Sequence, residues 1–201
     1  RELRDFILQG IWHIWIGFDH ILFLISLLLP AVLVRRDNAW QASPSLRDGI
    51  LEVVKVVTAF TAAHSITLSL AALQWISLPS RWVESAIAAS VVLAALNNIW
   101  PVAMARRWWV ALIFGLIHGF GFAGVLSGLE LPTHSLLAAL LGFNLGVELG
   151  QLFIVVVFMA AAWRLRGSAF YRRGVMSIGS LLIALLALLW LIERALDIKI
   201  I

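Results

Sequence analysis

The sequence predicts an all-α polytopic membrane protein, a helical bundle of about six transmembrane helices. Of its 201 residues, 62% are hydrophobic and only 13% are charged, whereas soluble domains carry about 25% charged residues. The mean hydropathy is +0.99. Apolar runs of roughly 20 residues recur along the chain, each long enough for a hydrocarbon core about 30 Å thick. We therefore expect residues 1–201 to form a single transmembrane domain in the lipid bilayer. Because the chain starts at Arg1 rather than Met, we also expect an upstream region that is not part of it.

Six apolar spans can be marked, and proline or arginine residues separate them. Pro30 ends the first span. Pro79 and Pro101 flank the third, and Pro132 precedes the fifth. Proline lacks a backbone N–H, so it destabilises a helix least at the helix end. An arginine-containing segment, 164–173, separates the fifth span from the sixth. The predicted spans are 7–29, 50–76, 80–101, 107–128, 136–163 and 174–193.

The distribution of Lys and Arg predicts the orientation of these spans. Ten basic residues lie on the side that follows the first, third and fifth spans, and five lie on the other side. Basic loops of membrane proteins stay in the cytoplasm, so we expect both termini on the outer side. The net charge of +4 then reflects topology, and we expect no nucleic-acid partner.

Ionisable residues inside the apolar spans are the candidate functional residues. A charged side chain near the bilayer centre costs at least about 2.5 to 3.5 kcal/mol, so such residues usually serve a function. With a rise of 1.5 Å per residue, His20 lies about 20 Å below the outer end of the first span, and His64 lies about 21 Å above the inner end of the second. His118 lies about 16 Å from the inner end of the fourth span, and Glu148 about 18 Å from the outer end of the fifth. We expect these four side chains to meet near mid-membrane.

Further polar residues extend this site along two spans. Ser65 follows His64 on a polar face of the second span. On the fifth span, a polar stripe at i, i+4 and i+7 is expected to face inward, and it consists of Asn144, Glu148 and Gln151. Glycines recur every four residues on the opposite side of this span, a spacing that allows close helix contact.

The first span holds two more ionisable residues whose roles the sequence leaves open. Asp19 is rotated about 100° from its neighbour His20 on a helix, so it is either a direct ligand or a group that orients a histidine. His13 lies about 10.5 Å above His20 along a regular helix. Either the helix is distorted around Gly17, or His13 forms an outer vestibule with Glu84 that guides ions inward. Of these two, we favour the vestibule.

Five blocks of residues follow one another between about residues 6 and 155. They are Gly10-x-x-His13-x-x-x-Gly17-x-Asp19-His20, Phe60-Thr-Ala-Ala-His64-Ser65, Glu84-Ser85-x-Ile87-Ala88-x-Ser90, Phe114-Gly115-Leu-x-His118-Gly119-x-Gly-Phe122-Ala123 and Phe143-Asn144-x-Gly146-x-Glu148-x-Gly150-Gln151. Together these blocks resemble the HupE/UreJ family of bacterial membrane proteins. The resemblance implies a multi-pass protein of the bacterial inner membrane, associated with hydrogenase and urease accessory functions, which are both nickel systems. It also implies a nickel or cobalt permease.

The leading hypothesis is a membrane protein that binds a divalent transition metal ion, namely nickel, cobalt or zinc, for uptake or handling. The chain has no cysteine, so His20, His64 and His118 would be the principal ligands, with an oxygen from Asp19 or Glu148. Imidazole and carboxylate ligands suit these metals, and they do not suit Mg²⁺ or Ca²⁺.

Two alternatives stay open at this point. An intramembrane zinc-dependent hydrolase would hold zinc on three histidines and lower the pKa of a bound water to about 7. Its substrate would be a lipid or a peptide-like chain, and its catalytic residues would be Asp19, Ser65 and Glu148. A structural subunit of a larger membrane complex, or of a homo-oligomer, would use the same polar groups to hold helices together.

Overall fold

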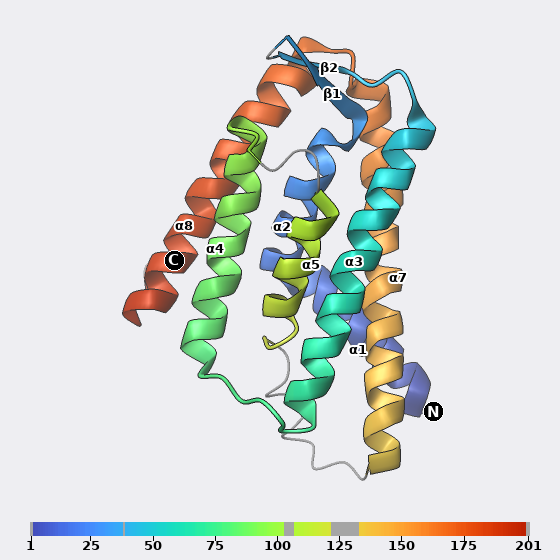
Figure 1. Cartoon of the computed structure of the whole chain (residues 1–201), viewed down its shortest axis with the longest axis vertical. Helices are drawn as coiled ribbons and strands as arrows, with labels where there is room; N and C mark the ends of the chain where they lie inside the picture. The colour runs from blue at the N-terminus through green and yellow to red at the C-terminus, as the bar shows by residue number, and fades with distance from the viewer. Residues whose placement is uncertain (1, 38, 103–106, 122–132, 200–201) are drawn as a thin grey trace.

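The chain folds into a helical bundle with a small β-hairpin at one end and both termini away from that hairpin (Figure 1). The computed structural model describes residues 2–37, 39–102, 107–121 and 133–199. Within these ranges the secondary structure is helical apart from the hairpin, and the predicted all-α class is confirmed. The α-helices are α1 (Glu2–Ile16), α2 (Phe18–Leu28), α3 (Leu46–Ala72), α4 (Ser80–Ile99), α5 (Arg107–His118), α7 (Thr133–Leu165) and α8 (Ser180–Leu196). The remaining elements are a 3-10 turn η1 (Leu29–Val32), a π-helical segment η3 (Phe170–Gly179), and the strands β1 (Leu33–Arg36) and β2 (Ala39–Ala42).

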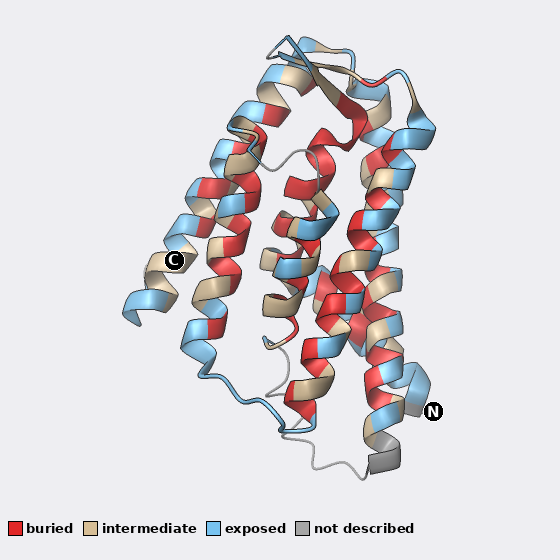
Figure 2. Ribbon diagram, in the orientation of Figure 1, coloured by how far each residue is buried: buried red, intermediate tan, exposed pale blue. Residues whose placement is uncertain are grey.

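Four of the predicted spans are continuous helices that are long and apolar enough to cross a membrane. They are Leu46–Ala72, Ser80–Ile99, Leu136–Leu165 and Phe170–Leu196, which correspond to the second, third, fifth and sixth predicted spans. Figure 2 shows exposed residues along the outward faces of these helices, and many of the exposed residues are large and apolar. Leu141 is 72% exposed, Val156 67% and Leu182 61%. Large apolar side chains in such numbers on the surface fit contact with lipid rather than with water.

The first predicted span, 7–29, is not one helix. It is broken at Gly17 into α1 and α2, and the two segments are bent by 71°. A Cβ atom at Gly17 would lie 2.8 Å from the carbonyl oxygen of His13 and 2.8 Å from Nδ1 of His20, so the bend needs a residue without a side chain. The backbone stays hydrogen-bonded across the break, from Gly17 N to His13 O and from Ile21 N to Gly17 O, each 3.0 Å. This continuity matters because an unsatisfied backbone group in hydrocarbon costs several kcal/mol.

The helix in the fourth predicted span, 107–128, is shorter than expected. Helix α5 ends at His118 and is followed by a turn through Gly121, so its 12 residues extend for only about 18 Å. This length brings His118 to the middle of the bundle without crossing it. Residues 122–128 of that predicted span lie outside the described residues.

Close glycine contacts hold together two helix pairs, α1 with α7 and α3 with α5, which carry His13, His64 and His118. Gly10 of α1 faces Gly146 of α7, and a Cβ at Gly146 would overlap the carbonyl oxygen of Ile7. Gly119, just after α5, packs on α3, where a Cβ would overlap Thr67 Oγ1 and the carbonyl oxygen of His64. Small residues therefore bring these backbones together, as their spacing predicts.

The β-hairpin was not predicted from the sequence. Its strands pair antiparallel, with Leu33 opposite Ala42. Trp40 of β2 donates a hydrogen bond from Nε1 to the carbonyl oxygen of Asn98 (3.3 Å). The Asn98 amide in turn donates to the Ser26 carbonyl oxygen (2.8 Å) and to Ser180 Oγ (3.2 Å). Asn98 thus fixes the ends of α2, α4 and α8 beneath the hairpin.

Candidate metal site at the helix break

The break at Gly17 brings His13 and His20 side by side. Their ring centroids are 4.6 Å apart, whereas a continuous helix would separate the two residues by about 10.5 Å along its axis. Of the two alternatives, the helix distorted at Gly17 describes the structure, and His13 lies beside His20 rather than one level above it. A role for Glu84 in guiding ions inward stays a prediction.

His64 of α3 completes a group of three histidines. Its ring centroid lies 6.3 Å from that of His13 and 6.2 Å from that of His20. One ring nitrogen from each of the three lies within 4.8 Å of the others. A tetrahedral ion with metal–nitrogen distances of about 2.0–2.1 Å needs nitrogens about 3.3 Å apart, so the three nitrogens would have to move closer together to hold one ion. His64 is fully buried and His20 is 7% exposed.

Asp19 fixes the ring of its neighbour His20. Oδ1 of Asp19 lies 2.9 Å from Nδ1 of His20. Because a carboxylate only accepts hydrogen bonds, Nδ1 carries the hydrogen, and Nε2 of a neutral ring presents its lone pair. Nε2 is buried and has no hydrogen-bond partner among the described residues. A carboxylate that holds the far nitrogen of a histidine is the usual support of a metal ligand.

His118 lies beside this group but not within it. Its ring centroid is 5.0 Å from that of His20, and its Nε2 is 2.8 Å from Ser90 Oγ. The single hydroxyl hydrogen of Ser90 goes to the Ile87 carbonyl oxygen (2.6 Å), so His118 Nε2–H is the donor to Ser90. The group of three is therefore His13, His20 and His64, while the sequence predicted His20, His64 and His118. Ser90 lies in the third of the five sequence blocks, but the sequence predicted no role for it at the site.

The polar residues of the fifth predicted span lie at different places around the histidines. Gln151 is buried and accepts a hydrogen bond from Thr61 Oγ1 (3.0 Å). The Asn144 amide lies close to His64, and its oxygen Oδ1 has no hydrogen-bond partner among the described residues. Glu148 is half-buried and lies outside the group of three.

Ser65 is turned back onto its own helix. Its hydroxyl donates to the Thr61 carbonyl oxygen at 2.7 Å. Hydroxyls that bond to the carbonyl four residues earlier satisfy themselves locally, so Ser65 does not present its proton to the histidines.

Glu84 lies at the end of the bundle away from the hairpin and is 51% exposed. It lines a cavity of about 500 Å³ together with Gln74, Phe120 and Gly121, and Gly121 follows His118 by three residues. The guanidinium of Arg194, in the last turn of α8, lies between the Glu84 and Asp19 carboxylates. Arg194 was not among the site residues predicted from the sequence, because a cation near the end of an apolar span usually extends to the membrane interface.

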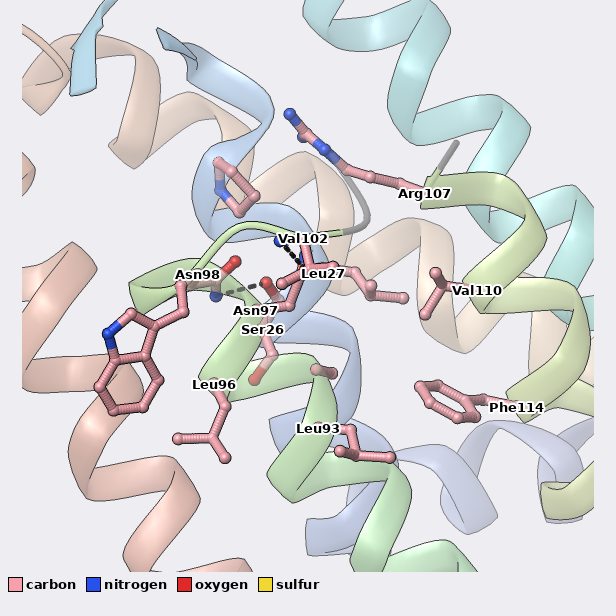
Figure 3. Close-up of a pocket in the computed structure, with 13 residues that line it drawn as sticks. Ser26, Leu27, Leu93, Leu96, Asn97, Asn98, Val102, Arg107, Val110 and Phe114 are labelled. Atoms are coloured by element: carbon pink, nitrogen blue, oxygen red, sulfur yellow. Dashed lines mark hydrogen bonds between the residues drawn. The ribbon is translucent and has the colours of Figure 1, made fainter. Parts of the chain in front are cut away.

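A second cavity, of about 350 Å³, lies at the hairpin end between α2, α4 and α5. Figure 3 shows Val110 and Phe114 of α5 lining it opposite α4, with Asn97 and Asn98 near its hairpin end. Phenylalanine rings stand between this cavity and the histidines. The Phe23 centroid lies 5.6 Å from that of Phe114 and 5.0 Å from that of His118.

The fold and this site define a polytopic helical membrane protein with a buried histidine cluster at a broken helix. The family model described as HupE / UreJ protein matches residues 1–194, so the chain belongs to the HupE/UreJ family and the resemblance seen in the sequence is confirmed. This membrane family is associated with nickel and cobalt transport. Searches of curated proteins and of solved structures found no match.

Proposed function

We propose that this protein binds a divalent transition metal ion, nickel, cobalt or zinc, as its cargo in the bacterial inner membrane, for uptake or handling. The observation that carries the proposal is the group of three ring nitrogens from His13, His20 and His64 within 4.8 Å. Ionisable groups are costly inside a membrane, and three of them in one place are hard to explain by helix packing alone.

The donor set supports a transition metal as the ion. Neutral imidazoles suit Zn²⁺, Ni²⁺ and Co²⁺, whereas Mg²⁺ and Ca²⁺ prefer oxygen ligands. Asp19 would orient His20, and the Asn144 amide oxygen would face the site from α7. The ion would arrive from the end that carries Glu84 and both termini, which we assign to the outer side from the charge distribution of the loops.

Metal binding can be tested with Co²⁺, because a tetrahedral Co²⁺ site absorbs visible light. The purified protein in detergent is expected to bind one Co²⁺ per chain, and His64→Ala is expected to abolish the absorption. Ser65→Ala is the matched control, because Ser65 is adjacent in sequence but bonds its own helix. Metal uptake into proteoliposomes should be lost in the same variant. A wild-type protein that binds no Co²⁺, Ni²⁺ or Zn²⁺ at neutral pH would overturn the proposal.

A zinc-dependent hydrolase is the second candidate, because three histidines with an open fourth position are also a hydrolytic zinc site. The contacts of the expected catalytic residues favour it less. Ser65 donates to its own helix, and Asp19 is engaged by His20 and Arg194. Tightly held, non-exchanging zinc with ester or amide hydrolysis and no metal flux would favour the hydrolase over the carrier. If all histidine variants behave as the wild type does in these assays, and the protein co-purifies with a fixed partner, the results would favour a structural subunit.

A further inference from the structure

Arg194 reaches from the last turn of α8 to carboxylates on two other helices. Its Nη2 lies 3.7 Å from Asp19 Oδ2 on α2, and its Nε lies 3.9 Å from Glu84 Oε2 on α4. Its Nη1 also donates to the Glu84 carbonyl oxygen at 3.3 Å. An arginine in this position usually interacts with the helix dipole and the membrane interface. Here it instead joins α8 to the residue that orients His20.

The guanidinium lies between the surface and the histidine site. On one side it lines a polar cavity of about 380 Å³ together with Glu84, Glu193 and Asp197. On the other side it contacts Asp19, whose second oxygen is bonded to His20 at 2.9 Å. A cation that moves from this cavity to His20 therefore meets the positive charge of Arg194 first.

The two carboxylate contacts of Arg194 are weak enough for the guanidinium to move away from Asp19. Both ion-pair distances, 3.7 and 3.9 Å, exceed the 2.7–3.2 Å of a direct N–H···O hydrogen bond. A doubly charged ion on His20 would repel the guanidinium, because, among the described residues, only the Asp19 carboxylate lies between the two like charges. Glu84, which is half exposed, offers the displaced guanidinium a second carboxylate nearer to the solvent.

We infer that Arg194 is an electrostatic latch on the outer side of the site. It neutralises Asp19 while no ion is bound, and it moves from Asp19 toward Glu84 when a dication binds to the histidines. This inference rests on the proposed function. As a positioning residue, Arg194 weakens metal binding, and so it favours release of the ion over its retention.

Whether substitution of Arg194 raises or lowers the affinity for Co²⁺ distinguishes a latch from a structural role. For Arg194→Gln, we expect the dissociation constant of Co²⁺ to fall by roughly tenfold, because one like charge is removed from the neighbourhood of the ion. Arg194→Lys keeps the charge and should bind as the wild type does. A purely structural Arg194 would give weaker binding in both variants. Arg81→Gln is the matched control, because Arg81 lies at the same end and bonds the Ala195 carbonyl oxygen rather than Asp19.

A second variant tests the charge within one folded protein. The chain has no cysteine, so Arg194→Cys introduces a single reactive thiol. Arg194→Cys lacks the positive charge, so we expect it to bind Co²⁺ more tightly than the wild type. A cationic methanethiosulfonate reagent should restore the wild-type Co²⁺ affinity, whereas a neutral methanethiosulfonate reagent should leave the affinity of the variant unchanged. Equal affinity after both reagents would overturn the latch while leaving the metal site in place. If the wild-type protein binds no Co²⁺, the proposed function fails and the latch fails with it.

Discussion

Oδ1 of Asp19 accepts hydrogen bonds from both the ring and the backbone of the next residue, with His20 Nδ1 and His20 N each 2.9 Å away. This geometry follows from the helix break, because Gly17 is the N-cap of α2 and Asp19 lies in the first turn. A carboxylate in a first turn also interacts favourably with the helix dipole. One side chain therefore stabilises the restart of the helix and sets the direction of a candidate ligand.

Replacing Asp19 with Asn should weaken metal binding without removing a ligand. The amide can hold the ring in place, but it makes the imidazole less basic and no longer offsets the charge of Arg194. Loss of such a carboxylate partner typically costs about 10- to 100-fold in metal affinity, and a Co²⁺ titration of Asp19→Asn would measure it. Asp5→Asn, on an exposed position of α1, is the control. Unchanged affinity in Asp19→Asn would show that Asp19 does not support the site.

Replacing Gly17 with Ala should disturb the histidine site through sterics alone. The new Cβ would lie 2.8 Å from His13 O and 2.8 Å from His20 Nδ1, and crowding of this kind costs about 1–3 kcal/mol. We expect a lower melting temperature in detergent and weaker Co²⁺ binding. Gly167→Ala is the control, because a Cβ there meets nothing within 4 Å. If the two variants behave alike, the close packing around Gly17 does not constrain the site.

The depth of the histidines could be predicted from the sequence, whereas the break at Gly17 was one of two alternatives between which the sequence could not decide. Counting residues from the span ends placed His20 and His64 at a common level, and their rings are 6.2 Å apart. The same counting assumed a regular helix and so separated His13 from His20. Gly17 was a weak signal, because glycine is frequent in membrane helices and most glycines there serve packing. His13 could be placed only once the 71° bend was known.

Other features depend on packing that a single sequence does not encode locally. Arg194 and Asp19 lie near opposite ends of the sequence, and only the arrangement of α8 against α2 brings them together. The apolar run of the fourth predicted span continues past His118, so hydropathy gave no reason to end the helix there. The four-residue strands of the hairpin are too short for an alternating pattern to be recognised.

Single histidine variants should separate the two possible ligand sets. His13→Ala is expected to abolish tetrahedral Co²⁺ absorption, because His13 belongs to the group of three. His118→Gln is expected to change the Co²⁺ dissociation constant by less than about tenfold, equivalent to about 1.4 kcal/mol, because the His118 Nε2–H is engaged by Ser90 at 2.8 Å. Glutamine keeps an N–H donor for Ser90. The reverse outcome, loss of the absorption in His118→Gln and its retention in His13→Ala, would favour the set predicted from the sequence.

Replacing Phe114 with Ala should speed the passage of ions between the histidines and the hairpin-end cavity. Phe114 lines that cavity, and its ring lies 5.6 Å from that of Phe23, which itself lies 5.0 Å from the His118 ring. Removing this ring opens an apolar constriction but changes no ligand, so Co²⁺ affinity in detergent should stay near the wild-type value. Uptake into proteoliposomes that contain a metal-sensitive dye should be faster than for the wild type. Phe153→Ala, with a ring that is 57% exposed on α7, is the control, and equal rates for the two variants would exclude a route past Phe114.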